Sequence, residues 1–181
     1  TREEAGAVAE GGKGRIHGPF TRAELDVAYG KGRWRPMHRF GVLQKGKVRP
    51  CDNARASLSN DATSTFESIE CDTADFPARV CVAFRAACDE RGVRMPKMQG
   101  GTDDLADAYR HVPCADPRFT VVALANPHTK EVEYYTLPGF NFGLKSAVLN
   151  FNRFPELTVA VARRLAWVVC THFYDDFCVV E

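Results

Sequence analysis

Short apolar runs, joined in pairs by turn-forming residues, make up much of the chain and predict three β-hairpins. The hairpins cover residues 40–51, 119–137 and 168–180. Asp175 and Asp176 fall at or beside the turn of the last one. The chain is therefore expected to contain antiparallel sheet in each of these three segments.

Apolar residues at three- and four-residue spacings predict helices between these hairpins. One helix is expected from an N-cap at Thr73 to a stop at Gly92, with the apolar stripe of residues 76–88 in the core. Another is expected over residues 145–152, and Pro155 is expected to separate it from a further helical run that ends near Trp167. In that run the residues expected to face inward are Val159, Val161, Ala162 and Leu165. Strands and helices in this proportion indicate the α/β class.

The first residues have a different character. Residues 1–18 are rich in Gly, Ala and Glu and are expected to form a flexible lead-in. Thr21 and Glu24 have the spacing of a capping box, which predicts a short helix ending by Gly30. Residues 1–37 are accordingly assigned to an N-terminal extension, partly flexible.

Length and composition limit the possibilities. The 181 residues are 45% hydrophobic, which suits one globular domain or slightly more, and the net charge of +1 gives no global attraction to nucleic acid. The seven cysteines form no Cys-x-x-Cys pair, so a zinc site is not expected. We expect a reducing compartment, cytoplasmic or nuclear. No run of about twenty apolar residues suggests a membrane span.

Positive charge is concentrated in residues 31–49, which contain no Asp or Glu. Trp34 and Phe40 lie among the basic residues. Two interpretations stand side by side: a solvated basic face, or contacts with nucleic-acid phosphates or a triphosphate. The basic residues are Lys31, Arg33, Arg35, Arg39, Lys45, Lys47 and Arg49.

Negative charge is concentrated at two points. Adjacent carboxylates such as Asp175 and Asp176 repel each other, and a hard divalent cation or ordinary solvation of a turn relieves that repulsion. Upstream, Asp104 is expected at the end of a strand and Asp107 one turn later in a short helix. These two carboxylates are either part of a site or simply caps of that helix.

Four segments, in order along the chain, resemble the motifs of reverse transcriptases. Residues 104–109, Asp-Leu-Ala-Asp-Ala-Tyr, and residues 173–176, Phe-Tyr-Asp-Asp, resemble the two carboxylate motifs of that family. Residues 142–147 are similar to its template- and nucleotide-positioning segment, and residues 46–52 resemble its fingers hairpin. The resemblance covers about residues 39–181 and is nearest to retrotransposon enzymes.

The resemblance implies a right-hand polymerase fold of fingers and palm, with an antiparallel palm sheet backed by helices. It places this domain at residues 38–181, with the fingers at about 38–72 and 113–145. The palm would occupy about 73–112 and 146–181 and would be incomplete, with the thumb missing.

The resemblance also implies an activity, the addition of dNTPs to a primer 3′-hydroxyl on an RNA or DNA template-primer. Asp104, Asp175 and Asp176 would then be the catalytic carboxylates. They would hold two Mg²⁺ ions, which Mn²⁺ can replace.

Nucleotide contacts are implied for a second group of residues. Arg49 matches the arginine at the α-phosphate, and Lys45 or Lys47 would reach the γ-phosphate. The main-chain N–H groups of Asp107 and Ala108 would face the triphosphate. Tyr109 would exclude a 2′-hydroxyl, although a half-buried core aromatic is the plainer interpretation. Phe142, Gly143 and Lys145 complete the set, with Gly143 letting the backbone approach the template base.

The chain departs from the family pattern in two places. The interval from Arg49 to Asp52 is one residue short, and residues 139–141 are extra. These departures keep open a truncated or decayed remnant that has no catalytic activity and at most binds nucleic acid. An RNA polymerase on the same palm is a third possibility, disfavoured by Tyr109 and Tyr174.

Overall fold

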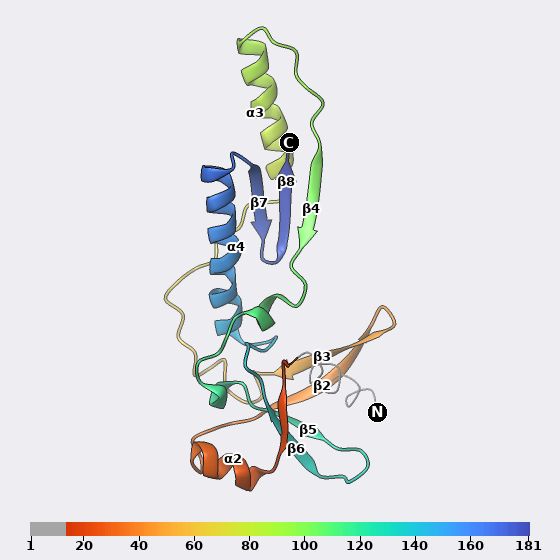
Figure 1. The fold of residues 1–181 in the computed structure, drawn as a ribbon, viewed down its shortest axis with the longest axis vertical. Helices are drawn as coiled ribbons and strands as arrows, with labels where there is room; N and C mark the ends of the chain where they lie inside the picture. Colours follow the sequence, from red (N-terminus) through yellow and green to blue (C-terminus); the bar gives the residue numbers. More distant parts are fainter. Residues whose placement is uncertain (1–13) are drawn as a thin grey trace. The chain divides into compact units, whose positions relative to one another are not determined.

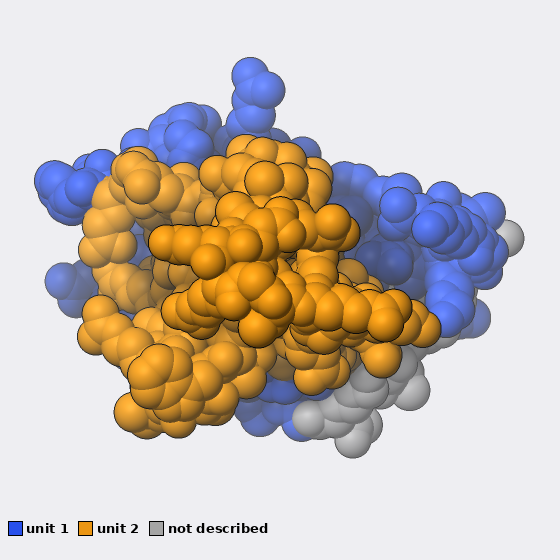
Figure 2. All heavy atoms as spheres, turned by 90° about the horizontal axis from the view of Figure 1, so that it is seen from above, with its two compact units in different colours: residues 1–66, 109–148 blue, residues 67–108, 149–181 orange. Residues whose placement is uncertain are grey.

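The computed structural model describes residues 14–181, which form two compact units. Unit 1 comprises the chain up to residue 66 together with residues 109–148, and unit 2 comprises residues 67–108 and 149–181 (Figure 2). Two sheets and three α-helices within residues 14–181 make this a mixed α/β fold.

Unit 1 is built on a five-stranded sheet in the order β1-β6-β5-β2-β3 (Figure 1). All neighbours are antiparallel except β2 and β5, which are parallel. The expected hairpins appear as β2–β3 and β5–β6, although β5 is shorter than expected and the exposed Phe119 ends a 3₁₀ turn before it. The strands are β1 His17–Phe20, β2 Met37–Gln44, β3 Lys47–Asn53, β5 Val122–Ala125 and β6 Val132–Thr136.

The N-terminal segment is part of this sheet rather than an extension. β1 pairs with β6, and Ile16, inside the expected lead-in, is buried in the core. The rest of that lead-in, residues 1–13, lies outside the described residues. The capping box is confirmed at helix α2, Arg22–Tyr29, where the Glu24 N–H donates to the Thr21 hydroxyl at 3.2 Å.

A single apolar cluster fills the core of unit 1. Met37, Val122 and Leu137 are fully buried at its centre, and Tyr109 and Phe140 pack against it. Burying side chains of this size contributes roughly 1.5–3 kcal/mol each. The chain following residue 108 is therefore fixed to the sheet of unit 1.

Unit 2 contains a three-stranded antiparallel sheet in the order β4-β8-β7. Its strands are β4 Gly100–Asp104, β7 Val169–Phe173 and β8 Asp176–Val180. Helix α3, Phe76–Glu90, contacts β8, and helix α4, Lys145–Leu165, reaches β7 where Arg163 Nε donates to the Cys170 carbonyl at 2.8 Å. The expected third hairpin and an antiparallel sheet with helices against it are both present.

The two long helices differ from expectation in detail. Asp75, not Thr73, is the N-cap of α3, and only Cys88 of its apolar stripe is buried. A stripe at helical spacing is buried only where another element covers it, and the strand that contacts α3 is β8. The rest of the stripe is partly buried, except for Phe84, which is exposed, so the expectation that the stripe is core is met only in part.

Helix α4 is continuous through Pro155, where a break was expected. Pro155 is fully buried on the same face as Phe151 and Val159, so packing offsets the N–H that proline lacks. Val161 and Leu165, expected inside, are exposed. None of the helices within residues 14–181 has the length and apolar character needed to cross a membrane.

Candidate active site

The β7–β8 hairpin places the Asp pair at and beside a two-residue loop. Phe173 pairs with Asp176, which leaves Tyr174 and Asp175 as the loop residues. Tyr174 has a φ of +56°, a left-handed conformation that non-glycine residues adopt only occasionally. Asp175 therefore lies in the turn and Asp176 at the first position of β8.

Strand β4 brings Asp104 to the same end of the sheet. Asp104 is the register partner of Asp176, and side chains directly opposite each other in an antiparallel pair have Cβ atoms about 4.5–5.5 Å apart. The next N–H along the chain, that of Leu105, donates to the Asp175 carbonyl at 3.0 Å. Sequence positions about seventy residues apart thus meet at one end of one sheet, as Figure 1 shows for β4 and β8.

The oxygen donors match the chemistry of Mg²⁺, which takes one or two carboxylates and keeps several waters. Asp104 and Asp176 are exposed, so water has access to both. Within residues 14–181, however, no three His, Cys, Asp or Glu side chains are grouped as a metal-ion site. The structure thus supplies a cross-strand carboxylate pair rather than a completed three-carboxylate cage.

Asp107, the second acidic residue of the upstream motif, lies outside the β4–β8 pair. Asp107 has a φ of +61° and is exposed immediately before a single 3₁₀ turn, Ala108–His111, whose first residue is buried. The expected short helix after Asp104 is present, and it is 3₁₀ rather than α.

Tyr109 lies in unit 1, where its ring is tilted by 59° against that of Phe142 with 5.0 Å between the ring centroids. It is half-buried and packs on the core cluster. The guanidinium of Arg110 lies 5.6 Å from the centre of the Phe142 ring. Both interpretations of Tyr109 therefore keep support, because one side of the ring packs on the core and another contacts a predicted site residue.

Gly143 makes the close approach that its sequence position suggested, but to protein. Its φ is +102°, and a Cβ placed there would lie 2.6 Å from the carbonyl oxygen of Asp52. The side chain of Asn60 bridges this segment, donating to the Gly143 carbonyl and accepting from the Lys145 N–H, both at 2.9 Å. The segment 142–145 is therefore held rigidly against the loop that follows β3.

The three extra residues, 139–141, are built into the interior of unit 1. A Cβ on Gly139 would lie 2.6 Å from the Arg110 carbonyl oxygen, and Asn141 is fully buried. The Phe140 N–H donates to the Val112 carbonyl at 3.1 Å. These residues form part of the packed interior of unit 1 rather than a protruding loop.

The β2–β3 hairpin carries the predicted phosphate contacts. Its turn is Lys45-Gly46, both with positive φ, as two-residue hairpin loops require. Lys47 and Arg49 lie two residues apart on β3 and share one face, and both are exposed. The basic tip is present as expected.

Arg39 is an exception to the predicted basic face. It is 3% exposed and forms a two-pronged ion pair with Asp52, with Nε–Oδ1 at 2.6 Å and Nη2–Oδ2 at 2.9 Å. Arg110 Nη2 lies 3.9 Å from the same carboxylate. Asp52 and Arg110 were missed, although a hairpin centred on Lys45-Gly46 places Arg39 opposite Asp52, so the register could have found this pair.

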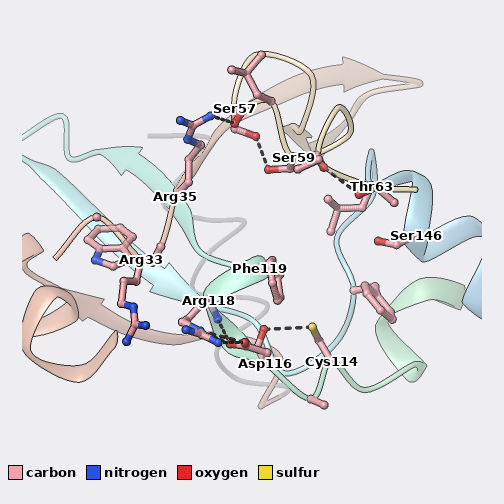
Figure 3. A pocket seen from close by; sticks show the side chains of 17 residues that line it. Arg33, Arg35, Ser57, Ser59, Thr63, Cys114, Asp116, Arg118, Phe119 and Ser146 are labelled. Carbon is pink, nitrogen blue, oxygen red and sulfur yellow. Dashed lines mark hydrogen bonds and ion pairs between the residues drawn. The ribbon is translucent and has the colours of Figure 1, made fainter. Parts of the chain in front are cut away.

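Other members of the basic stretch line a cavity of about 680 Å³ in unit 1 (Figure 3). Arg35 donates to the Ser57 carbonyl at 2.9 Å, and Arg118 pairs with Asp116, which lowers the pKa of that carboxyl. Burial raises the pKa of the Cys114 thiol on the cavity wall. A fully solvated basic face is therefore not the whole account of residues 31–49.

Comparison with known proteins adds no family assignment. No protein-family model matches this chain, and no curated protein matches it either. The arrangement of its own residues therefore carries the functional argument.

Proposed function

We propose that the chain is the fingers and palm region of an RNA-directed DNA polymerase, one that adds dNTPs to a primer 3′-hydroxyl on a template-primer. The observation that carries the proposal is the register pairing of Asp104 with Asp176, with Asp175 in the adjoining turn. A solvated turn requires no carboxylate on the neighbouring strand. The antiparallel sheet contacted by α3 and α4 supports the same assignment.

In this proposal the chain's residues divide the work. Asp104, Asp175 and Asp176 provide negative oxygens at the reacting end of the sheet. Bound Mg²⁺ would supply activation of the primer hydroxyl and neutralisation of the leaving pyrophosphate. Lys45 or Lys47 contributes a point charge and Arg49 a planar fork, both suited to phosphate oxygens.

Selection of the sugar is assigned to Tyr109. Its ring is braced by Phe142 at 5.0 Å, and Phe142 is in turn braced by Arg110. A braced ring cannot move aside for a 2′-hydroxyl without losing these contacts, which favours deoxynucleotides.

Primer extension tests the proposal, with Mg²⁺ and either dNTPs or NTPs. Asp104→Asn should lower dNTP incorporation at least about a hundredfold, because metal-ion catalysis supplies several kcal/mol and each ~1.4 kcal/mol is tenfold. The matched control is Asp103→Asn. Asp103 is the neighbouring residue on β4 and pairs with Phe177, so its side chain lies on the other face of the strand.

The outcomes separate the alternatives. Extension with dNTPs that is sensitive at Asp104 and insensitive at Asp103 supports the proposal. Extension that prefers NTPs indicates an RNA polymerase. Binding of template-primer without extension by the unsubstituted chain indicates a remnant with binding activity only.

A further inference from the structure

His172 is a buried titratable residue to which the catalytic scheme above gives no role. It lies on β7, is 4% exposed, and precedes the loop residue Tyr174 by two positions. Its ring is tilted over that of Phe177 on β8, with 6.1 Å between the centroids. A polar ring enclosed in this way needs partners for its nitrogens.

Both ring nitrogens have such partners. Nδ1 lies 3.3 Å from the carbonyl oxygen of Tyr174, and Nε2 lies 3.4 Å from Oε1 of Glu156 on α4. A carbonyl oxygen only accepts hydrogen bonds, so the bond to Tyr174 needs a proton on Nδ1. The Glu156 carboxylate lies at the opposite end of the ring, beside Nε2.

The Tyr174 carbonyl belongs to the peptide unit that joins Tyr174 to Asp175. Holding that oxygen fixes the plane of this peptide, which follows a residue with a φ of +56° and precedes the first carboxylate of the pair. The next carbonyl, that of Asp175, accepts from the Leu105 N–H at 3.0 Å beside Asp104. One ring therefore holds the turn at the point where its geometry is least favourable.

We propose that His172 is a positioning residue that locks the Tyr174–Asp175 peptide and thereby holds the Asp pair in register with Asp104. Glu156 orients the ring from helix α4. The catalytic consequence rests on the proposed function, whereas the lock itself does not.

Two isosteric substitutions separate the two nitrogens. His172→Asn places an amide nitrogen near the position of Nδ1 and keeps a donor for the Tyr174 carbonyl. His172→Gln places one near Nε2 and keeps only the Glu156 contact. A residue needed only for packing would respond similarly to both changes.

Amide hydrogen exchange of the chain without metal or substrate is the first measurement. The Leu105 amide reports on the turn, and the Glu181 amide, which donates to the Gln99 carbonyl at 2.9 Å at the other end of the β4–β8 pair, is the internal control. His172→Gln should speed exchange at Leu105 by at least about tenfold, and His172→Asn should stay within about threefold of the unsubstituted chain. Exchange at Glu181 should not change in either variant.

Primer extension is the second measurement. His172→Gln should lower kcat at least about tenfold with little change in KM for the dNTP, because the lock positions reacting groups rather than binding substrate. Equal exchange at Leu105 in both variants, or acceleration at Glu181 as well, overturns the lock. The expected exchange pattern in a chain that extends no primer upholds the lock and removes the polymerase assignment instead.

Discussion

Replacing Asp52 by Asn should destabilise unit 1 strongly. The Asp52 side chain is 0% exposed, and the side chains of Arg39 and Arg110 beside it are each 3% exposed. The substitution keeps the side-chain volume but removes the carboxylate that pairs with Arg39 and lies 3.9 Å from Arg110. Removing one partner of a buried ion pair typically costs about 3–5 kcal/mol, and we expect a loss in this range in the free energy of unfolding.

Urea denaturation followed by tryptophan fluorescence measures this loss. The chain has two tryptophans, Trp34 in unit 1 and Trp167 in unit 2, so a Trp167→Phe background reports on unit 1 alone. The matched control is Asp116→Asn, which breaks the partly exposed pair with Arg118 in the same unit and should cost much less, because solvent screens that pair. A loss for Asp52→Asn no larger than for Asp116→Asn would refute the reasoning.

A double substitution tests the same argument through the difference in unfolding free energy between the double and the single variant. Asp52→Leu combined with Arg39→Met should be less destabilising than Asp52→Leu alone, because it also removes the buried guanidinium that was paired with Asp52. Additive losses would mean that Arg39 does not depend on Asp52.

Three further predictions follow from other contacts. Tyr109→Ala should raise the ratio of rNTP to dNTP insertion by about tenfold or more, each ~1.4 kcal/mol of steric rejection being one factor of ten; a lowered melting temperature with an unchanged ratio would leave only the packing role. Gly143→Ala should destabilise the chain by more than about 1 kcal/mol, measured by urea denaturation, because the new Cβ would meet the Asp52 carbonyl at 2.6 Å at a φ of +102°; a melt unchanged from that of the unsubstituted chain would contradict it. The Thr171 hydroxyl donates a hydrogen bond to Asp72 at 2.5 Å and is the main cause that lowers the pKa of that carboxyl, so the stability that Asp72 contributes is present above its unfolded pKa of about 3.9 and is lost as pH falls through the lower folded value. The loss of unfolding free energy caused by Thr171→Val should therefore shrink between pH 6 and about pH 2, and a loss independent of pH would argue against this.

Local signals in the sequence predicted the local structures well. The capping box at Thr21, the hairpin over residues 40–51 and the hairpin at Asp175 are all set by neighbours within a few positions, and all three are confirmed. The order of the sheets and the pairing of β4 with β8 depend on segments far apart in the chain. Only the family resemblance predicted that Asp104 lies close to Asp176.

Several of the wrong predictions have one physical cause, which is that periodicity reports a capacity for burial rather than burial itself. Phe84 on α3 and the residues Val161 and Leu165 on α4 have core spacing, yet they are exposed. The predicted helix break at Pro155 is absent, because the packing of the buried proline outweighs the lost hydrogen bond. Arg39 looked like a surface cation, since its partner Asp52 is adjacent only after the hairpin has formed.

Mn²⁺ binding, followed by electron paramagnetic resonance of the chain without nucleotide, is the most direct test of the central claim that Asp104 and the Asp pair form a catalytic metal site. Mn²⁺ takes the place of Mg²⁺ at oxygen ligands and reports its own bound fraction. The account predicts specific binding that Asp176→Asn and Asp104→Asn each abolish and that Asp103→Asn leaves intact. Binding unaffected by Asp104→Asn and Asp176→Asn, or no specific binding at all, would contradict it.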